Sequence, residues 1–126
     1  MRLLGVDYGL KRIGLALSEG ELATPLGQVG DIGAVARIAG EQAVGKIVIG
    51  LPDPRNVKIK LFGERLTELT GIPVEYFDET FSTREARSKM IAAGTSPKDR
   101  QDSIDETAAA VILQSYLDSR PEGVPL

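Results

Sequence analysis

An uninterrupted apolar run near the middle of the chain constrains the fold more than any other feature of the sequence. The run Lys46-Ile47-Val48-Ile49-Gly50 is rich in β-branched residues and lacks the apolar–polar alternation of a strand with one face in water. Such a run is typical of a strand that is buried on both faces. It predicts a sheet that carries helices on its two sides.

The residues before this run predict an antiparallel hairpin. Leu3–Val6 and Arg12–Leu17 are apolar runs, and Gly9-Leu10-Lys11 between them fits a tight turn. A third, shorter strand is expected near Glu21–Thr24. The N-terminal part of the sheet is therefore expected to be antiparallel.

Helices are expected before and after the central run. Asp31 can cap a helix that continues to about Ala43, and Gly45 is its expected stop. After the central run, apolar residues recur at helical spacing as far as Gly71. These residues are Ile59, Phe62, Leu66 and Leu69.

The remaining segments continue the alternation of strand and helix. Val74–Phe77 reads as a strand, and the pairs Ser82/Glu85 and Ser103/Glu106 are capping boxes that open two further helices. The expected fold class is α/β, a single domain with a mixed β-sheet flanked by helices. The domain is expected to span residues 1–119, followed by a flexible tail at 120–126 that contains two prolines and a glycine.

Two absences narrow the chemistry. The 126 residues include no cysteine, which excludes disulfides, thiolate zinc sites and cysteine nucleophiles. They include no histidine either, which excludes serine–histidine triads and imidazole metal ligands. Acid–base chemistry must then use carboxylates, lysine or metal-bound water, and carboxylates alone suit a hard cation such as Mg²⁺ or Mn²⁺.

Charge and hydropathy bear on partners and location. The net charge of −3 by itself disfavours nucleic-acid binding. The sequence nevertheless contains short basic groups, such as Lys11-Arg12 and Arg84/Arg87/Lys89, which could either contact phosphates or belong to an ordinary solvated surface. No apolar run approaches the length of a membrane span. The segment Met1–Asp7 reaches an acid too early for a secretion signal, so we expect a cytoplasmic protein without a membrane partner.

Acidic residues stand at the ends of three expected elements. Asp7 directly follows the first apolar run, Asp78 and Glu79 follow the strand at Val74–Phe77, and Asp105 lies in the first turn of the last helix. Each has an ordinary explanation as a turn residue or as an acid that favours a helix N-terminus. Together they suggest a cation site, because three convergent carboxylates repel one another without a cation. Position alone does not decide between Asp78 and Glu79.

Four blocks of the sequence resemble the YqgF/RuvX family, in order and over nearly the whole chain. The blocks are Gly5–Ala16, Ile49–Pro52, Asp78–Ala86 and Ile104–Leu117. The resemblance implies a ribonuclease-H-like fold and a bacterial metal-dependent nuclease. It also implies that Asp7, Glu79 and Asp105 are catalytic and hold one or two Mg²⁺ or Mn²⁺ ions. Lys11, Arg12 and Arg84 are then expected to contact the substrate.

The sequence departs from the family pattern at two places. Thr80 stands where the family usually has arginine after the acidic pair, and Asp53–Asn56 is shorter than the usual glycine-containing loop. Both departures concern substrate handling more than metal binding.

The expected function is hydrolysis of phosphodiester bonds in nucleic acid, structured RNA or branched DNA. On the family resemblance we favour 5′-end maturation of precursor 16S ribosomal RNA. The alternatives are a Holliday junction resolvase, which would need two active sites and hence a homodimer, and a non-catalytic nucleic-acid-binding domain. A nucleotide-phosphate module related to sugar kinases is disfavoured, because such proteins need two lobes and this chain has room for one. Monomer and homodimer both remain open.

Overall fold

The computed structural model describes residues 1–78 and 104–119, with only the backbone described at 104–107. Its strands are β1 (Arg2–Tyr8), β2 (Ile13–Glu19), β3 (Leu22–Val29), β4 (Val44–Leu51) and β5 (Val74–Asp78). Its helices are α1 (Ile32–Glu41), α2 (Val57–Thr70) and α5 (Ile104–Ser119). The expected helix at Ser82 and the expected tail at 120–126 lie outside the described residues.

The five strands form one mixed sheet in the order β3-β2-β1-β4-β5, with β1 at the centre. The pairs β1–β2 and β2–β3 are antiparallel, whereas β1–β4 and β4–β5 are parallel. The predicted hairpin and the predicted mixed sheet are both confirmed. The third strand is longer than expected, because Leu22–Val29 pairs with the whole length of β2.

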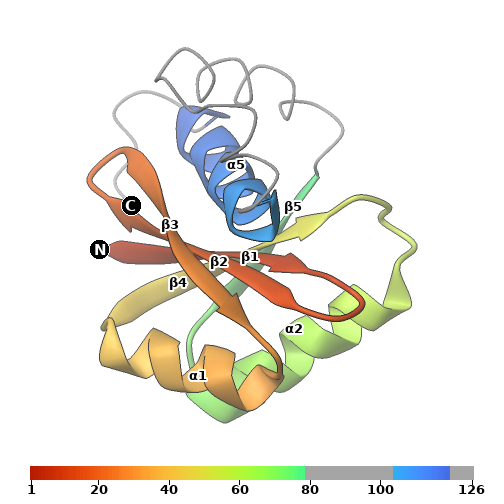
Figure 1. Cartoon of the computed structure of the whole chain (residues 1–126). Coiled ribbons are helices and arrows are strands. Elements are labelled where there is room, and N and C mark those ends of the chain that lie inside the picture. Colours follow the sequence, from red (N-terminus) through yellow and green to blue (C-terminus); the bar gives the residue numbers. More distant parts are fainter. Residues whose placement is uncertain (79–103, 120–126) are drawn as a thin grey trace.

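Helices cover both faces of the sheet, α5 on one face and α1 with α2 on the other (Figure 1). Ile47, Val48 and Ile49 are each completely buried, so the central run is covered on both sides as predicted. Ile47 and Ile49 belong to the cluster beneath α1 and α2, and Val48 belongs to the cluster beneath α5. The alternation of side chains along a strand therefore assigns each residue to one of two cores.

The described residues test three of the expected helix-end signals, and two of these, Asp31 and Gly71, are confirmed. Asp31 caps α1 by accepting a hydrogen bond from the Ala34 amide at 2.8 Å. Gly71, with a φ of 71°, ends α2 in the left-handed conformation that favours glycine. Gly45 was expected to stop α1, and this was wrong: the helix ends at Glu41, and Gly45 lies inside β4. Ala43 takes the positive φ of 53° instead, and pairing with β1 then extends β4 towards the helix.

None of the helices in residues 1–78 and 104–119 combines the length and the apolar character that crossing a membrane requires.

Candidate active site

Asp7 lies near the carboxyl end of β1, the central strand, and its side chain is half-buried. This is the position expected from the sequence. Residues 3, 5 and 7 of the strand share one face, since successive side chains of a strand alternate. Leu3 belongs to the α5 cluster, so Asp7 lies on the α5 face of the sheet, and Leu4 and Val6 lie on the other.

The strands on either side of Asp7 leave space on this face. Gly14 of β2 is paired with Asp7, and Gly50 of β4 follows Ile49, the partner of Val6. Neither glycine carries a side chain that could project beside the carboxylate. A cation or a phosphate group can therefore approach Asp7 more closely than larger residues would permit.

Helix α5 runs along the sheet in the direction opposite to β1. A Cβ atom built on Gly5 would lie 2.7 Å from the Leu113 Cβ and 3.0 Å from the Ala109 carbonyl oxygen. Tyr116, further along α5, contacts Lys46, which is paired with Leu3 near the start of β1. The helix therefore begins towards the carboxyl end of β1, where Asp7 lies.

The backbone of Asp105 is in the first turn of α5, four residues before Ala109. At about 1.5 Å per residue, this places its backbone roughly 6 Å further along the helix axis than Ala109, in the direction of Asp7. Asp7 is itself two residues beyond Gly5 on β1. The fold thus brings the start of α5 towards the end of β1, although the two segments are nearly a hundred residues apart in sequence.

Of the two neighbouring acids at the end of β5, the structure describes Asp78 and not Glu79. Asp78 is the last residue of β5 and is paired with Leu51, which packs on the α1/α2 side. Phe77, one residue earlier, packs on the α5 side and meets the Tyr116 ring at 6.0 Å. Alternation therefore places Asp78 on the face opposite Asp7. Glu79 lies outside the described residues.

The expected basic contacts lie in the turn between β1 and β2. Lys11 and Arg12 are both exposed, and the turn is closed by a hydrogen bond of 3.0 Å from the Gly9 amide to the Arg12 carbonyl. The Arg12 guanidinium donates to the Gln28 side chain on β3 at 3.1 Å. The turn follows Asp7 directly, so both cations stand beside the end of β1. Arg84 lies outside the described residues.

The short loop after β4 is a compact turn that leads into α2. Asp53 accepts hydrogen bonds from the Arg55 amide and guanidinium, and these bonds lower the pKa of the Asp53 carboxyl. Asn56 then caps α2 by accepting from the Ile59 amide at 3.0 Å. The short loop at Asp53–Asn56 is therefore an ordered connection between β4 and α2.

At the other end of β4, a polar cluster that the sequence did not predict joins the sheet to α5. Lys46 Nζ lies 3.3 Å from both the Tyr116 hydroxyl and Glu75 Oε2, and the hydroxyl donates to the same carboxylate oxygen. The hydrogen bond with Tyr116 raises the pKa of Lys46, and burial raises the pKa of Tyr116. The cluster lies on the α5 face near the start of β1, away from Asp7, and serves to hold the helix.

This cluster predicts a loss of stability in alkali. The raised pKa values of Tyr116 and Lys46 mean that their protonated forms favour the folded state, so the stabilisation is complete below the unfolded-state values and is lost as pH rises through the folded-state ones. The urea midpoint should stay level near neutrality and fall above about pH 10. Tyr116→Phe should start from a lower midpoint and fall less steeply. Parallel curves for the two proteins would contradict this assignment.

Comparison with known proteins shows which family the chain belongs to. The family described as RuvX, Holliday junction resolvase, matches residues 1–119. The chain belongs to the RuvX family. Members from Anaeromyxobacter dehalogenans strain 2CP-C and Syntrophus aciditrophicus, each named as a pre-16S rRNA nuclease, are both 40% identical to it. The alignments cover 95% and 94% of this chain and 98% and 89% of those proteins.

Solved structures share the fold of this RuvX protein. RuvC of Thermus thermophilus, in complex with a Holliday junction, superposes with a TM-score of 0.61 and 14% identity, over 95% of both chains. The fowlpox virus resolvase with its junction DNA gives 0.56 and 15% identity, over 94% of this chain and 98% of that one. The predicted ribonuclease-H-like fold, a mixed sheet flanked by helices, is thereby confirmed.

Of the three acids that the sequence assigns to the RuvX site, Asp7 alone has a described side chain. Within residues 1–78 and 104–119, no three acidic side chains converge as metal ligands. Glu79 and the carboxylate of Asp105 lie outside the described residues.

Proposed function

We propose that this chain is a metal-dependent endonuclease that hydrolyses phosphodiester bonds in the 5′-end maturation of precursor 16S ribosomal RNA. The observation that carries the proposal is the place of Asp7: a half-buried carboxylate at the end of the central strand, between two glycines, with the start of α5 directed towards it. The names of the relatives support the substrate.

The residues at this place fit a hard divalent cation. The available ligands are carboxylate oxygens, since the chain has neither histidine nor cysteine. Asp7, Glu79 and Asp105 would hold one or two Mg²⁺ or Mn²⁺ ions. When bound, such an ion supplies positive charge that makes a water easier to deprotonate and neutralises the charge on the phosphoryl oxygens.

Alternation along β5 supports Glu79 rather than Asp78 as the partner of Asp7. Asp78 shares its face of the sheet with Leu51, on the side of α1 and α2, whereas Asp7 lies on the α5 side. Two carboxylates on opposite faces of a sheet cannot share one ion. The residue that follows Asp78 is the acid that the family resemblance assigns to the site.

The chain's own side chains would position the scissile strand. Lys11 and Arg12, exposed in the turn that follows Asp7, would bind phosphates next to the one that is cut, and Arg84 would bind a further phosphate. Such contacts orient the backbone without reading its sequence. Gly14 and Gly50 leave the approach to the carboxylate free of side chains.

The family description favours a second candidate, cleavage of four-way DNA junctions. The two functions differ in the assembly that they require. A resolvase makes paired cuts and therefore needs a homodimer, whereas processing of an RNA end is possible for a monomer. The oligomeric state in solution thus bears on the choice of substrate.

The test is cleavage of labelled single-stranded RNA, precursor 16S rRNA and a four-way DNA junction, each with Mg²⁺, Mn²⁺ or EDTA. We expect cleavage of the rRNA precursor with either ion and none in EDTA. Preferential cutting of the junction by a dimer would favour the resolvase instead. Binding without cleavage of any substrate would show a non-catalytic nucleic-acid-binding domain and overturn the proposal.

A further inference from the structure

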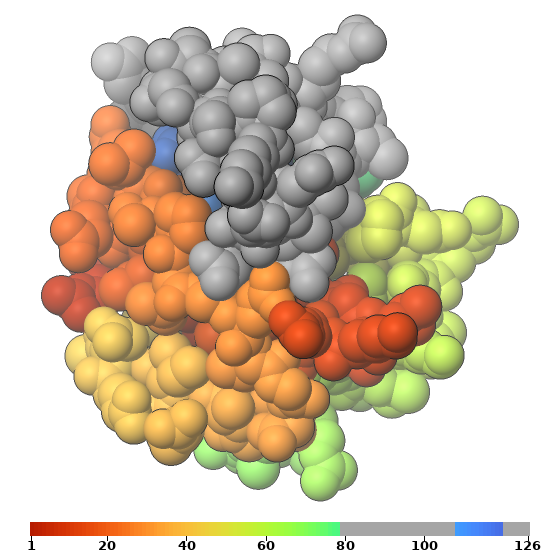
Figure 2. Space-filling view, in the orientation of Figure 1, coloured from red at the N-terminus to blue at the C-terminus, as the bar shows by residue number. Residues whose placement is uncertain are grey.

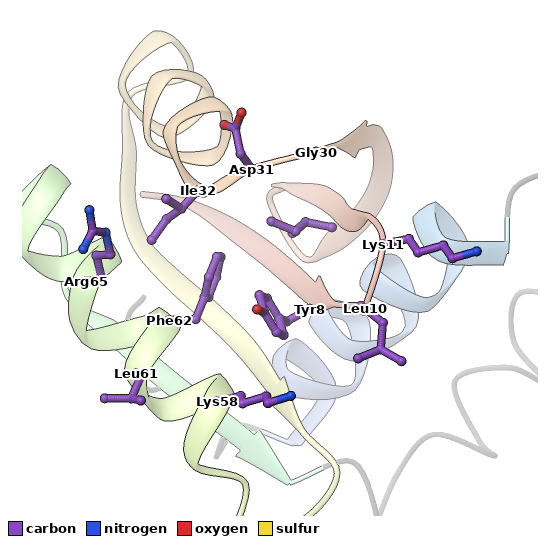
Figure 3. A pocket seen from close by; sticks show the side chains of 12 residues that line it. Tyr8, Leu10, Lys11, Gly30, Asp31, Ile32, Lys58, Leu61, Phe62 and Arg65 are labelled. Carbon is purple, nitrogen blue, oxygen red and sulfur yellow. The ribbon is translucent and has the colours of Figure 1, made fainter.

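A pocket of about 420 Å³ lies on the α1/α2 side of the sheet, opposite the face that carries Asp7 (Figure 3). Its walls are the end of β1 with the β1–β2 turn, the residues that open α1, and one side of α2. Its volume falls within the range of about 300–1,000 Å³ that is usual for small-molecule sites. Because the three walls are far apart in sequence, only the tertiary structure reveals the pocket.

The pocket is basic in a chain whose net charge is −3. Lys58 and Arg65 are seven residues apart on α2, so both reach the pocket from the same side of the helix, and Lys11 joins them from the turn. All three are exposed, and none forms an ion pair within the part of the chain that the structure describes. Their charge is therefore available to a ligand.

The acid among the lining residues has a structural role. Asp31 contributes to the wall, but its Oδ1 accepts the hydrogen bond that caps α1 at the Ala34 amide. The hydrogen bond does not remove the charge of the carboxylate, so the lining sets three cations against this one anion and carries a positive net charge. An anionic ligand is favoured.

The floor of the pocket is aromatic and its rim is apolar. The Tyr8 and Phe62 rings lie with their centroids 4.6 Å apart, and Figure 3 shows them together at the middle of the pocket. At the rim, Leu10 is 96% exposed and Leu61 is 57% exposed. Apolar side chains so open to water, next to cations, suit a ligand that combines a flat apolar part with negative charge.

We propose that this pocket binds a nucleotide from a single-stranded segment of nucleic acid. The base would lie against the Tyr8–Phe62 floor, and the neighbouring phosphates would lie near Lys58 and Arg65. Stacking on aromatic side chains combined with cations along the backbone is the usual means of binding single strands. A paired base inside a duplex could not enter a pocket of this shape, and a free phosphate would make no use of the aromatic floor.

The pocket and the candidate active site contain neighbouring residues of β1. Tyr8 follows Asp7 in β1, and the two side chains lie on opposite faces of the sheet. A strand that runs from one to the other passes around the β1–β2 turn, where Lys11 lies. Figure 2 shows this turn at the molecular surface beside α2. That the bound strand is the one being cut rests on the proposed function.

The test measures binding in EDTA, so that it depends on neither a metal nor cleavage. The affinity of the whole protein for a short labelled single-stranded RNA is followed by fluorescence polarisation. Lys58→Gln with Arg65→Gln should weaken binding by about 10-fold or more and lower the salt slope by about 1.4, which is 0.7 for each of two phosphate contacts. The matched control, Arg37→Gln with Lys60→Gln, removes the same amount of charge from α1 and α2 at positions outside the pocket. It should change binding less than about 2-fold.

A second variant tests the aromatic floor. Tyr8→Leu should weaken RNA binding by roughly 5- to 150-fold, the loss expected for one stacked base, and should leave the binding of inorganic tripolyphosphate unchanged. Thermal unfolding identifies any variant that fails to fold. An effect of the Lys58/Arg65 pair no larger than that of the control pair would overturn the proposal. So would an unaltered RNA affinity in Tyr8→Leu, which would indicate a site for phosphate alone.

The outcome is separable from that of the proposed function. If the pocket variants weaken RNA binding in EDTA but the protein cuts no substrate, the proposed binding site stands and the proposed nuclease activity is wrong. If the protein cuts nucleic acid with metal but the pocket variants bind RNA normally, the proposed nuclease activity stands and the proposed binding site is wrong.

Discussion

Asp7→Asn should reduce metal-dependent cleavage at least about 100-fold, since loss of an outer-shell partner alone commonly reduces activity about 10- to 100-fold. The amide has nearly the same shape as the carboxylate, but it carries no charge to hold a cation among the other acids. The change should therefore leave the fold intact. The measurements are the initial rate of cleavage with saturating Mg²⁺ or Mn²⁺ and the thermal midpoint of the metal-free protein.

Glu41→Gln is the matched control for this variant. Glu41 lies at the end of α1, more than half exposed, and pairs with Arg37 at 3.6 Å on the helix surface. Exposed pairs of this kind contribute little to stability. Full activity in Glu41→Gln combined with full activity in Asp7→Asn would remove Asp7 from the site, and with it the proposed mechanism.

Gly5→Ala should destabilise the protein, because the added methyl group overpacks the contact between β1 and α5. The new Cβ would meet the Leu113 Cβ at 2.7 Å and the Ala109 carbonyl at 3.0 Å, so α5 would have to move away from the sheet. Overpacking of this kind costs about 1–3 kcal/mol. Urea unfolding gives the change in the free energy of unfolding. Cleavage should fall as well, because the helix that shifts also carries Asp105.

Gly40→Ala is the control for the added methyl group. Gly40 lies within α1, and a Cβ there meets no atom within 4 Å. The same substitution should then raise the free energy of unfolding by about 0.5–1 kcal/mol, because alanine favours a helix. Equal effects at the two positions would show that α5 does not rest on Gly5 as closely as described.

The structure describes one of the two departures from the family pattern. Thr80 lies outside the described residues, whereas the short loop at Asp53–Asn56 forms an ordered turn that leads into α2. It brings Lys58 and the rest of α2 to the pocket beside Tyr8. The proposed site at Asp7 and the proposed nucleotide pocket thus lie at one end of the sheet, on opposite faces.

Most of the fold was readable from local patterns. The β-branched run at 46–50 required cover on both faces, Asp31 supplied a cap, and Gly71 supplied a left-handed end, since each signal acts over a few residues. Gly45 failed as a stop signal because pairing with β1 extends β4 over it. Local propensity is weaker than the hydrogen bonds of a strand next to the centre of a sheet.

By itself, the sequence determined the chemistry that is possible and the acids that could perform it. A chain without histidine or cysteine leaves carboxylates and a hard cation, and the positions of Asp7, Glu79 and Asp105 follow from motif and family. Only the tertiary structure decided which side of the sheet each group occupies. Register and the direction of α5 put Asp7 on the α5 face, put Asp78 on the other, and assembled a basic aromatic pocket from three distant segments. Those relations depend on contacts between residues far apart in the chain, which no local pattern encodes.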